Sequence, residues 1–395
     1  MTMRGGRLLS LVLATKLYWG MAFVLVIGAL LSPVDGVGGN IFLSLPNLTD
    51  VLRQVSITGI IAVGMTFVIL SGGIDLSVGS VMALGCTLTA MLLTQDGWHR
   101  GALVGTGAAS IVAALAVYAG AAKLLAGRLG VMAGVVLGGL AAVSMAAWIA
   151  PALAGGLGVV QTVVLVLSVG LLIGAFNGAV VTVGGLQPFI ATLATMVAVL
   201  GAARLTAGAD QSVYPVYTGA NAAPTFELLR ASMLRVPVPG LIFLAVAAVA
   251  GVVLTRFRFG REVYAIGGNE QAARLAGLAV GQTKILVYAL SGMLASLAGV
   301  LYTAQYRQGK PDAGVGLELD AIAAVVIGGA SLAGGKGSIP GALAGVLIFG
   351  ILTNIFQLCN IDSNAQLVLK GLIIVAAVAL QQGRVPRLRR AGGST

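Results

Sequence analysis

The chain has 395 residues, of which 58% are hydrophobic and only 9% are charged. Soluble domains carry about 25% charged residues, so this composition excludes a soluble globular protein and a disordered one. The 23 basic and 12 acidic residues give a net charge of +11. The basic residues gather in a few short segments, which is the pattern of cytoplasmic loops in membrane proteins, and we expect no nucleic-acid binding.

Apolar runs separated by polar breaks predict a membrane protein with about twelve spans. A helix that crosses a bilayer needs about 20 predominantly apolar residues, and the 58 glycines suit helices that pack closely in lipid. We therefore predict an all-α polytopic transmembrane helical bundle, formed as one domain over residues 1–395. The predicted spans, in chain order, are 17–33, 51–71, 76–95, 101–125, 129–151, 159–183, 188–207, 239–256, 283–306, 319–335, 338–357 and 364–381.

The charges predict on which side of the membrane each loop lies. Four basic clusters fall on the same side when the N-terminus is cytoplasmic, and this arrangement places both termini in the cytoplasm. The clusters are 4–16, 123–128, 256–284 and the tail 382–395. The two longest segments on the opposite side are 208–238 and 307–318. The first apolar run is interpreted as a retained helix, because no small-residue cleavage site stands out after it.

Two glycine-rich segments, 71–80 and 326–338, interrupt the apolar runs and have a similar composition. Paired interruptions are typical of transporters with internal repeats, and chance similarity between two glycine-rich stretches explains them equally well. Asp75 lies in the first segment and has two interpretations. It lines a transport pathway, since a carboxylate at membrane depth usually faces a cavity or a partner, or it caps the helix that follows, which the Asp-Leu-Ser-Val-Gly-Ser pattern favours.

The residues suggest no catalytic, metal or nucleotide site. The single histidine, His99, cannot build a zinc site, and Cys86 and Cys359 lie in apolar surroundings without a CxxC pair. The Gly-Lys pair at 335–336 is not a phosphate-binding loop, because glycine follows where that loop needs Ser or Thr. We therefore expect no enzyme activity, no resident cofactor and no metal.

The polar loop 256–282 carries the signals of a short helix that follows a Gly-rich turn. Asn269 is a good N-cap, Glu270 and Arg274 form an i,i+4 pair, and Gly277 is placed to end the helix. A helix of about two turns is not stable alone in water. It must therefore rest on its own membrane domain or dock into a partner.

At these residues the chain resembles a known family. The segment GREVYAIGGNEQAARLAGL (260–278) resembles the coupling-helix segment of the ribose/xylose-type permeases of ATP-binding-cassette (ABC) importers. The other segments with this resemblance are RQVSITGIIAVGMTFVILSGGIDLSVGSVMAL (53–84), GAFNGAVVTVGGLQPFIATLATM (174–196), ELDAIAAVVIGGASLAGGKGSIPGALAGVLIFGIL (318–352) and VLKGLIIVAAV (368–378). Relative to the ten-span core of such permeases, the apolar runs near 101–158 are two extra spans.

The resemblance implies a division of labour. Such permeases form a pore as a homodimer or a pair of permeases in the bacterial inner membrane. A periplasmic binding protein delivers a monosaccharide or a similar small polyol, and a cytoplasmic ABC ATPase with tandem cassettes binds ATP and holds the coupling helix in a groove. The residues assigned to this docking are Gly267, Gly268, Asn269, Glu270, Ala273, Arg274 and Gly277. Ala273 is expected on the outer face, where a small side chain permits close approach.

Polar and aromatic residues in the spans are candidates for the sugar pathway. Amide and hydroxyl side chains suit an uncharged polyol, and the same groups also join helices through hydrogen bonds. The candidates are Asp75, Asn177, Phe189, Thr192, Thr195, Asn354 and Gln357. The alternative function is an ion-coupled secondary sugar transporter, which needs several intramembrane carboxylates; Asp75 is the one clear candidate.

Overall fold

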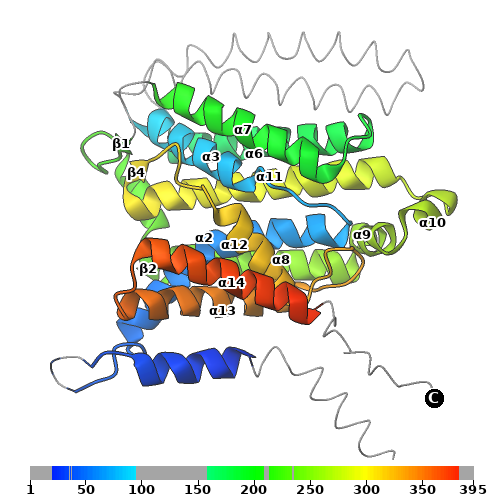
Figure 1. Ribbon diagram of the computed structural model, residues 1–395. Helices are drawn as coiled ribbons and strands as arrows, with labels where there is room; N and C mark the ends of the chain where they lie inside the picture. Colours follow the sequence, from blue (N-terminus) through cyan, green and yellow to red (C-terminus); the bar gives the residue numbers. More distant parts are fainter. Residues whose placement is uncertain are drawn as a thin grey trace, which may run out of the picture.

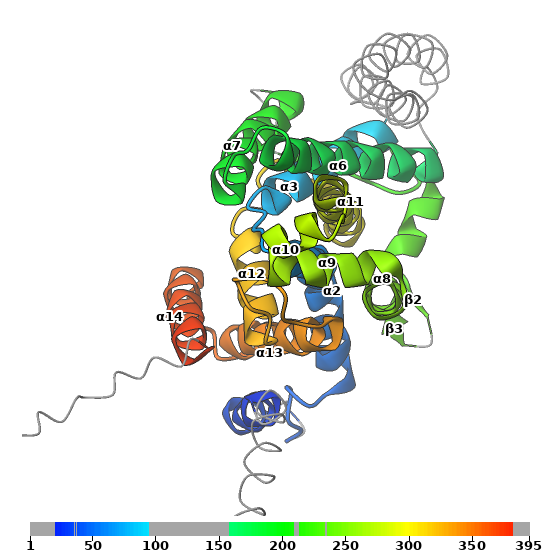
Figure 2. The ribbon, with the colours of Figure 1, turned by 90° about the vertical axis from the view of Figure 1, so that its right-hand side faces the viewer.

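The computed structural model describes residues 20–34, 36, 38–94, 158–208, 213–233 and 235–381. Within these ranges the chain is an all-α polytopic bundle, built around two long helices that lie side by side, α2 (Leu45–Leu70) and α11 (Val280–Tyr306) (Figure 1, Figure 2). The predicted spans 101–125 and 129–151 and the basic tail 382–395 lie outside the described residues.

The other helices pack around these two. The helices on α11 are α3 (Val78–Leu93) and α6 (Val159–Thr182), and α7 (Pro188–Ala207) packs against α3. The helices on α2 are α8 (Val238–Arg256), α12 (Leu317–Ile327) and α13 (Ile339–Leu358). The last helix, α14 (Ser363–Gln381), packs against α12 and lies at the side of the bundle (Figure 2).

Glycine allows α6 and α11 to approach closely. Gly170, Gly174 and Gly178 recur every four residues, so they share one face of α6, and a Cβ atom at any of them would collide with α11. Gly292 of α11 meets the backbone of Gly170 in the same way. In lipid, close packing of this kind is a main source of helix association, which accounts for part of the high glycine content.

Six helices in the described ranges are long and apolar enough to cross a membrane, namely α2, α6, α7, α8, α11 and α13. Helix Gly20–Leu31 and α3 are apolar but shorter. The predicted span 319–335 is wrong in its second half, because α12 ends at Ile327 and residues 328–338 form a loop. Several glycines of this loop adopt positive φ, which ends the helical path.

The loops gather at two ends of the bundle (Figure 1). At the strand end, β1 (Tyr214–Pro215) pairs antiparallel with β4 (Gln308–Gly309), with Tyr214 opposite Gly309. The other elements there are β2 (Ser232–Met233), β3 (Val236–Pro237) and the 3-10 helix η2 (Pro224–Leu229). At the α10 end lie α9 (Arg258–Gly268) and α10 (Glu270–Leu275). β1 and β4 belong to the two long segments, 208–238 and 307–318, that are predicted to lie on one side of the membrane. Their pairing agrees with this prediction.

The two glycine-rich interruptions meet at the α10 end. The Gly335 amide donates a hydrogen bond to the Leu70 carbonyl at 3.0 Å, so the loop after α12 touches the end of α2. Gly267 of α9 lies against the same two residues, and the Tyr264 hydroxyl donates to the Gly337 carbonyl at 2.8 Å. α9 is therefore seated on both interruptions.

Candidate functional site

α10 is bounded by the signals predicted from the sequence. The Asn269 side chain accepts a hydrogen bond from the Ala272 amide at 3.0 Å, as an N-cap does. Gly277 has φ +80°, and the last amides fold back onto carbonyls of the final turn, which is a left-handed C-cap. The Glu270–Arg274 pair is present at 3.0 Å. These features of the short helix are confirmed.

The residues before α10 differ from the prediction. In place of a Gly-rich turn they form α9, which includes Gly267 and Gly268. The break between the two helices falls at Asn269, whose backbone is extended at φ −161° and ψ 100°. Two consecutive glycines are typical of a turn, and burial of Val263 and Ile266 against the bundle holds the helix nevertheless.

The predicted docking residues divide into an outer and an inner group. Four of them are exposed, namely Gly268, Asn269, Arg274 and Gly277, and two are partly exposed, namely Gly267 and Glu270. Ala273 is only 5% exposed and packs against α9 and α11, while Gly267 lies against the end of α2 and the loop 328–338. The prediction that Ala273 lies on the outer face is wrong, because a helix this short must bury one face to be held in place.

Leu275 is an outer residue of α10 that the sequence analysis missed. Its side chain is 90% exposed, although leucine is usually buried. Successive residues turn by about 100° in a helix, so Leu275 points away from the face that buries Ala273. If Ala273 is placed on the buried face, the helical periodicity of 270–275 puts Leu275 on the exposed face. An exposed leucine between small exposed residues, Ala272 and Ala276, suits contact with another surface.

Glu270 joins α10 to α11. Its carboxylate pairs with Lys284 Nζ at 2.6 Å and with Arg274 Nη2 at 3.0 Å. The Lys284 side chain is only 11% exposed, so salt screens this pair less than an exposed one. The hydrogen bond from Lys284 is the main reason why the pKa of Glu270 lies below its ordinary value. Beside the pair is a cavity of about 380 Å³, also lined by Thr182 and Gln187 from the α6–α7 connection.

Asp75 lies in a buried hydrogen-bond network. Its carboxylate accepts hydrogen bonds from the Ser77 amide at 3.0 Å, from the Ser77 hydroxyl at 2.6 Å and from the Ser291 hydroxyl of α11 at 3.0 Å. Asn177 of α6 donates to Ser77 Oγ at 2.9 Å and accepts from Thr195 of α7 at 2.6 Å. The structure thus brings together three predicted pathway residues, Asp75, Asn177 and Thr195, all of them buried.

Thr192 and Phe189 lie near this network on α7. The Thr192 hydroxyl is 2.9 Å from the Pro188 carbonyl and 3.3 Å from the Ile74 carbonyl, so it ties the start of α7 to the segment before α3. Phe189 is 52% exposed. Asp75 accepts a hydrogen bond from the Ser77 amide, which forms an Asx turn ahead of α3. The N-cap residue of α3 is Ser77, whose side chain makes no capping hydrogen bond, so Asp75 lies before the helix and is not its N-cap.

Asn354 and Gln357 lie near the strand end. Asn354 and Asn47 exchange amide hydrogen bonds of 3.1 and 2.8 Å, which join α13 to α2. Gln357 lines a strand-end pocket of about 390 Å³. The residues of the strand-end pocket are Asp50, Arg53, Gln54, Arg230, Gln305, Tyr306 and Gln357. Of the predicted pathway residues, Gln357 therefore lines a pocket, whereas Asn354 joins two helices.

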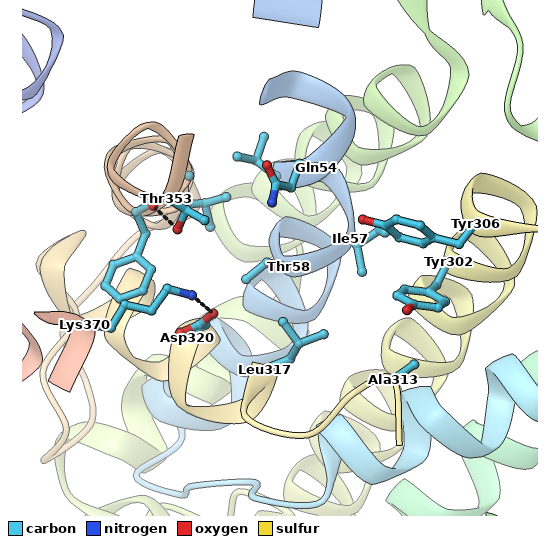
Figure 3. A pocket seen from close by; sticks show the side chains of 14 residues that line it. Gln54, Ile57, Thr58, Tyr302, Tyr306, Ala313, Leu317, Asp320, Thr353 and Lys370 are labelled. Atoms are coloured by element: carbon cyan, nitrogen blue, oxygen red, sulfur yellow. Dashed lines mark hydrogen bonds and ion pairs between the residues drawn. The ribbon is translucent and has the colours of Figure 1, made fainter. Parts of the chain in front are cut away.

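A second pocket lies between α2, α11, α12, α13 and α14 and has a volume of about 180 Å³ (Figure 3). We call it the ion-pair pocket; its polar lining residues are Gln54, Thr58, Tyr302, Tyr306, Asp320, Thr353 and Lys370. Figure 3 shows the two tyrosines of α11 on one side and Asp320 with Lys370 on the opposite side. The Asp320–Lys370 pair measures 2.9 Å, and the side chains are 18% and 19% exposed.

Three residues of this pocket, Tyr302, Asp320 and Lys370, are not among the pathway residues predicted from the sequence. The two charged residues fall inside the predicted spans 319–335 and 364–381. A charge inside a span is costly and usually has a partner, so two opposite charges in spans separated by only one other span are the signal that could have found this pair. The two pockets share Gln54 and Tyr306 and therefore adjoin.

Known proteins resemble this chain over most of its length. Residues 47–137 and 128–378 match the family described as branched-chain amino acid transport system / permease component. The ribose import permease protein RbsC of Bacillus subtilis (strain 168) is 36% identical over 366 residues, which cover 92% of this chain and 91% of that protein. RbsC of Escherichia coli (strain K12) is 39% identical over 345 residues, covering 85% and 86%. No solved structure matches the chain.

The xylose transport system permease protein XylH of Escherichia coli (strain K12) is 36% identical over 362 residues, covering 85% of each chain. These matches confirm the resemblance that the coupling-helix segment first indicated, and the apolar helices of the bundle suit a membrane permease. The chain therefore belongs to the permease family of ABC transporters, among the relatives of the ribose and xylose import permeases.

Proposed function

We propose that this chain is the membrane-spanning permease subunit of an ABC importer and forms the translocation pathway for a monosaccharide or a similar small polyol. A periplasmic binding protein delivers the sugar, and a separate cytoplasmic ATPase with tandem cassettes hydrolyses ATP. Two permease subunits, as a homodimer or a pair, enclose the pathway in the inner membrane, with both termini cytoplasmic. The names of the relatives, which are permeases for ribose, allose and xylose, support the sugar class.

α10 carries the proposal. It is a six-residue helix at one end of the bundle that exposes Leu275 and Arg274, and this favours docking into a groove of the ATPase. Glu270 links α10 to α11 through Lys284, and α11 in turn packs on α2, α3 and α6. A displacement of α10 by the ATPase therefore reaches the centre of the bundle through one ion pair and one long helix.

Reconstitution tests the proposal. The chain, its ATPase and its binding protein are placed in proteoliposomes, and uptake of labelled ribose, xylose and allose is measured. Uptake should require both ATP and the binding protein, and the permease purified alone should not bind ATP. An ion-coupled secondary transporter would instead take up sugar with this chain alone when a sodium or proton gradient is applied, and that result would overturn the proposal.

A further inference from the structure

We infer that the ion-pair pocket is a binding station for the transported polyol, in which the Asp320–Lys370 pair and the α11 tyrosines contact the sugar. The inference rests on the proposed function and names the contact residues that it leaves open.

The lining suits an uncharged molecule with many hydroxyl groups. Each hydroxyl both donates and accepts hydrogen bonds; the Asp320 carboxylate offers acceptors and the Lys370 ammonium offers donors. Because the two charges oppose each other at 2.9 Å, the pair has no net charge and favours a neutral ligand. Tyr302 and Tyr306, with ring centroids 4.4 Å apart, present aromatic surface across the pocket (Figure 3), and such surface suits the C–H face of a sugar ring.

A structural role alone explains the ion pair poorly. Charges within a membrane protein are costly and usually mark a substrate path or a relay. A pair that served only to hold α12 against α14 could be replaced by apolar contacts at little cost. Instead, Asp320 and Lys370 line the pocket wall, and the Lys370 ammonium is further positioned 5.7 Å from the centroid of the Phe349 ring.

The ion-pair pocket has room for a small ligand. Its volume of about 180 Å³ is much larger than the ~10–15 Å³ that one water molecule needs. Gln54 and Tyr306 line both pockets, so the ion-pair pocket adjoins the strand-end pocket. In that pocket the buried atoms Arg53 Nε and Gln305 Oε1 have no hydrogen-bond partner among the described residues. Buried polar atoms of this kind are usually satisfied by water or a ligand.

A labelling experiment detects the binding directly. In a Cys359→Ser background, Thr353→Cys places a thiol on the wall of the ion-pair pocket, while Thr255→Cys places one on the exposed last turn of α8 as a control. A transported sugar at twice its dissociation constant should slow thiol labelling of Thr353→Cys about threefold and leave Thr255→Cys unchanged. Equal labelling with and without millimolar ribose, xylose or allose, whichever is transported, would overturn the inference.

Transport by the assembled complex provides the second test. Asp320→Asn and Lys370→Met should each lower sugar uptake per ATP hydrolysed about tenfold, a loss of about 1.4 kcal/mol. The matched control is Asp362→Asn, before α14, because an asparagine side chain can still accept the hydrogen bond from the Asn364 amide. The charge-swapped double variant, Asp320→Lys with Lys370→Asp, keeps the pairing between helices and should still transport poorly.

The outcomes separate this inference from the proposed function. If the wild-type complex takes up no monosaccharide, the proposed function fails and the inference fails with it. If the wild type transports and the charge-swapped variant transports equally well, the ion pair is only structural, and the inference alone is wrong. Sugar protection of Thr353→Cys together with poor transport by the charge-swapped variant supports it.

Discussion

Glu270 of α10 and Lys284 of α11 form an ion pair of 2.6 Å whose lysine side chain is 11% exposed. Ala273 of α10 also packs with Ile266 and Val280. Among the described residues, a small apolar cluster and an ion pair thus help to hold the segment that we propose to receive the movement of the ATPase.

Glu270→Gln should uncouple the complex. The amide cannot form the ion pair with Lys284, so α10 should move without α11, and transport per ATP should fall about tenfold. Arg258→Gln breaks an i,i+4 pair with Glu262 in which the arginine side chain is 81% exposed, and it should change nothing measurable. Transport and ATP hydrolysis are both measured in proteoliposomes, which gives the amount of sugar taken up per ATP hydrolysed. If this amount is unchanged in Glu270→Gln, the ion pair does not couple α10 to α11.

Because of the Glu270–Lys284 ion pair, we expect sugar uptake per ATP hydrolysed to depend little on pH in the wild type. The hydrogen bond from Lys284 lowers the pKa of Glu270, so the stability that this pair contributes is present above the unfolded pKa, about 4.3, and is lost as the pH falls through the lower folded value. Uptake per ATP should therefore stay constant from pH 8 to about pH 5. A steep decline between pH 7 and about pH 6 would place the sensitive group elsewhere.

Leu275→Asp should weaken ATPase binding. The side chain is 90% exposed, so the isolated permease should keep its stability, while loss of an interface anchor costs about 2 kcal/mol or more. Leu228→Asp, at a 66% exposed leucine of η2 at the strand end, is the control. Co-purification of the ATPase should fall with the first variant and remain with the second. Equal retention in both would show that α10 is not the docking helix.

Gly267→Ala and Gly268→Ala should differ although the residues are adjacent. A Cβ atom at Gly267 collides with the backbone of Leu70 and Gly335, whereas one at Gly268 meets nothing. Gly267→Ala should therefore lower the thermal stability in detergent by about 1–3 kcal/mol. Gly268→Ala should be neutral or stabilising by up to about 1 kcal/mol, because alanine favours a helix over glycine. Equal melting temperatures would mean that α9 does not sit on the two loops.

Asp75→Ala should destabilise the bundle. It leaves the Ser77 and Ser291 hydroxyls and the Ser77 amide without their acceptor, at about 1–3 kcal/mol for each group that stays unpaired. Thr66→Val is the control, since the buried Thr66 hydroxyl donates its hydrogen bond to the Ala62 carbonyl of its own helix. Thermal unfolding compares the two. If Asp75→Ala keeps wild-type stability and loses only transport, Asp75 is a pathway residue and not a joint between helices.

Cysteine labelling tests the orientation of the bundle. Tyr217, 58% exposed at the strand end, and Lys336, exposed at the α10 end, are each changed to Cys in a Cys359→Ser background. A membrane-impermeant reagent should label Tyr217→Cys from the periplasmic side and Lys336→Cys only from the cytoplasmic side. The reverse pattern would invert the topology.

Signals that act over a few residues predicted the structure well. The apolar run with Pro188 in its first turn marked both ends of α7, and Asn269 and Gly277 marked those of α10. α9 was missed because tertiary packing of Val263 and Ile266 overrides its two glycines.

The pockets could not be predicted in this way. Helices that are apolar on all sides do not reveal which face meets which neighbour. The pairing of Asp320 with Lys370, and of Asn177 with Thr195, follows from that arrangement of helices and not from the local sequence. The amide and hydroxyl residues selected as pathway candidates were therefore of the expected chemical type, but several of them join helices instead.

The packing around α2 has a consequence for how the protein is made. Among the described residues, every helix that packs extensively on α2 begins at Val238 or later. The Asn47 side chain of α2 can form its hydrogen bonds with Asn354 only after α13 has been synthesised. At ~5–20 residues per second, the ribosome takes on the order of ten seconds to produce the first of these neighbours. During that interval the nascent α2 resides in the bilayer or the insertion machinery without its native contacts. Maturation of the N-terminal half therefore waits for translation of the C-terminal half.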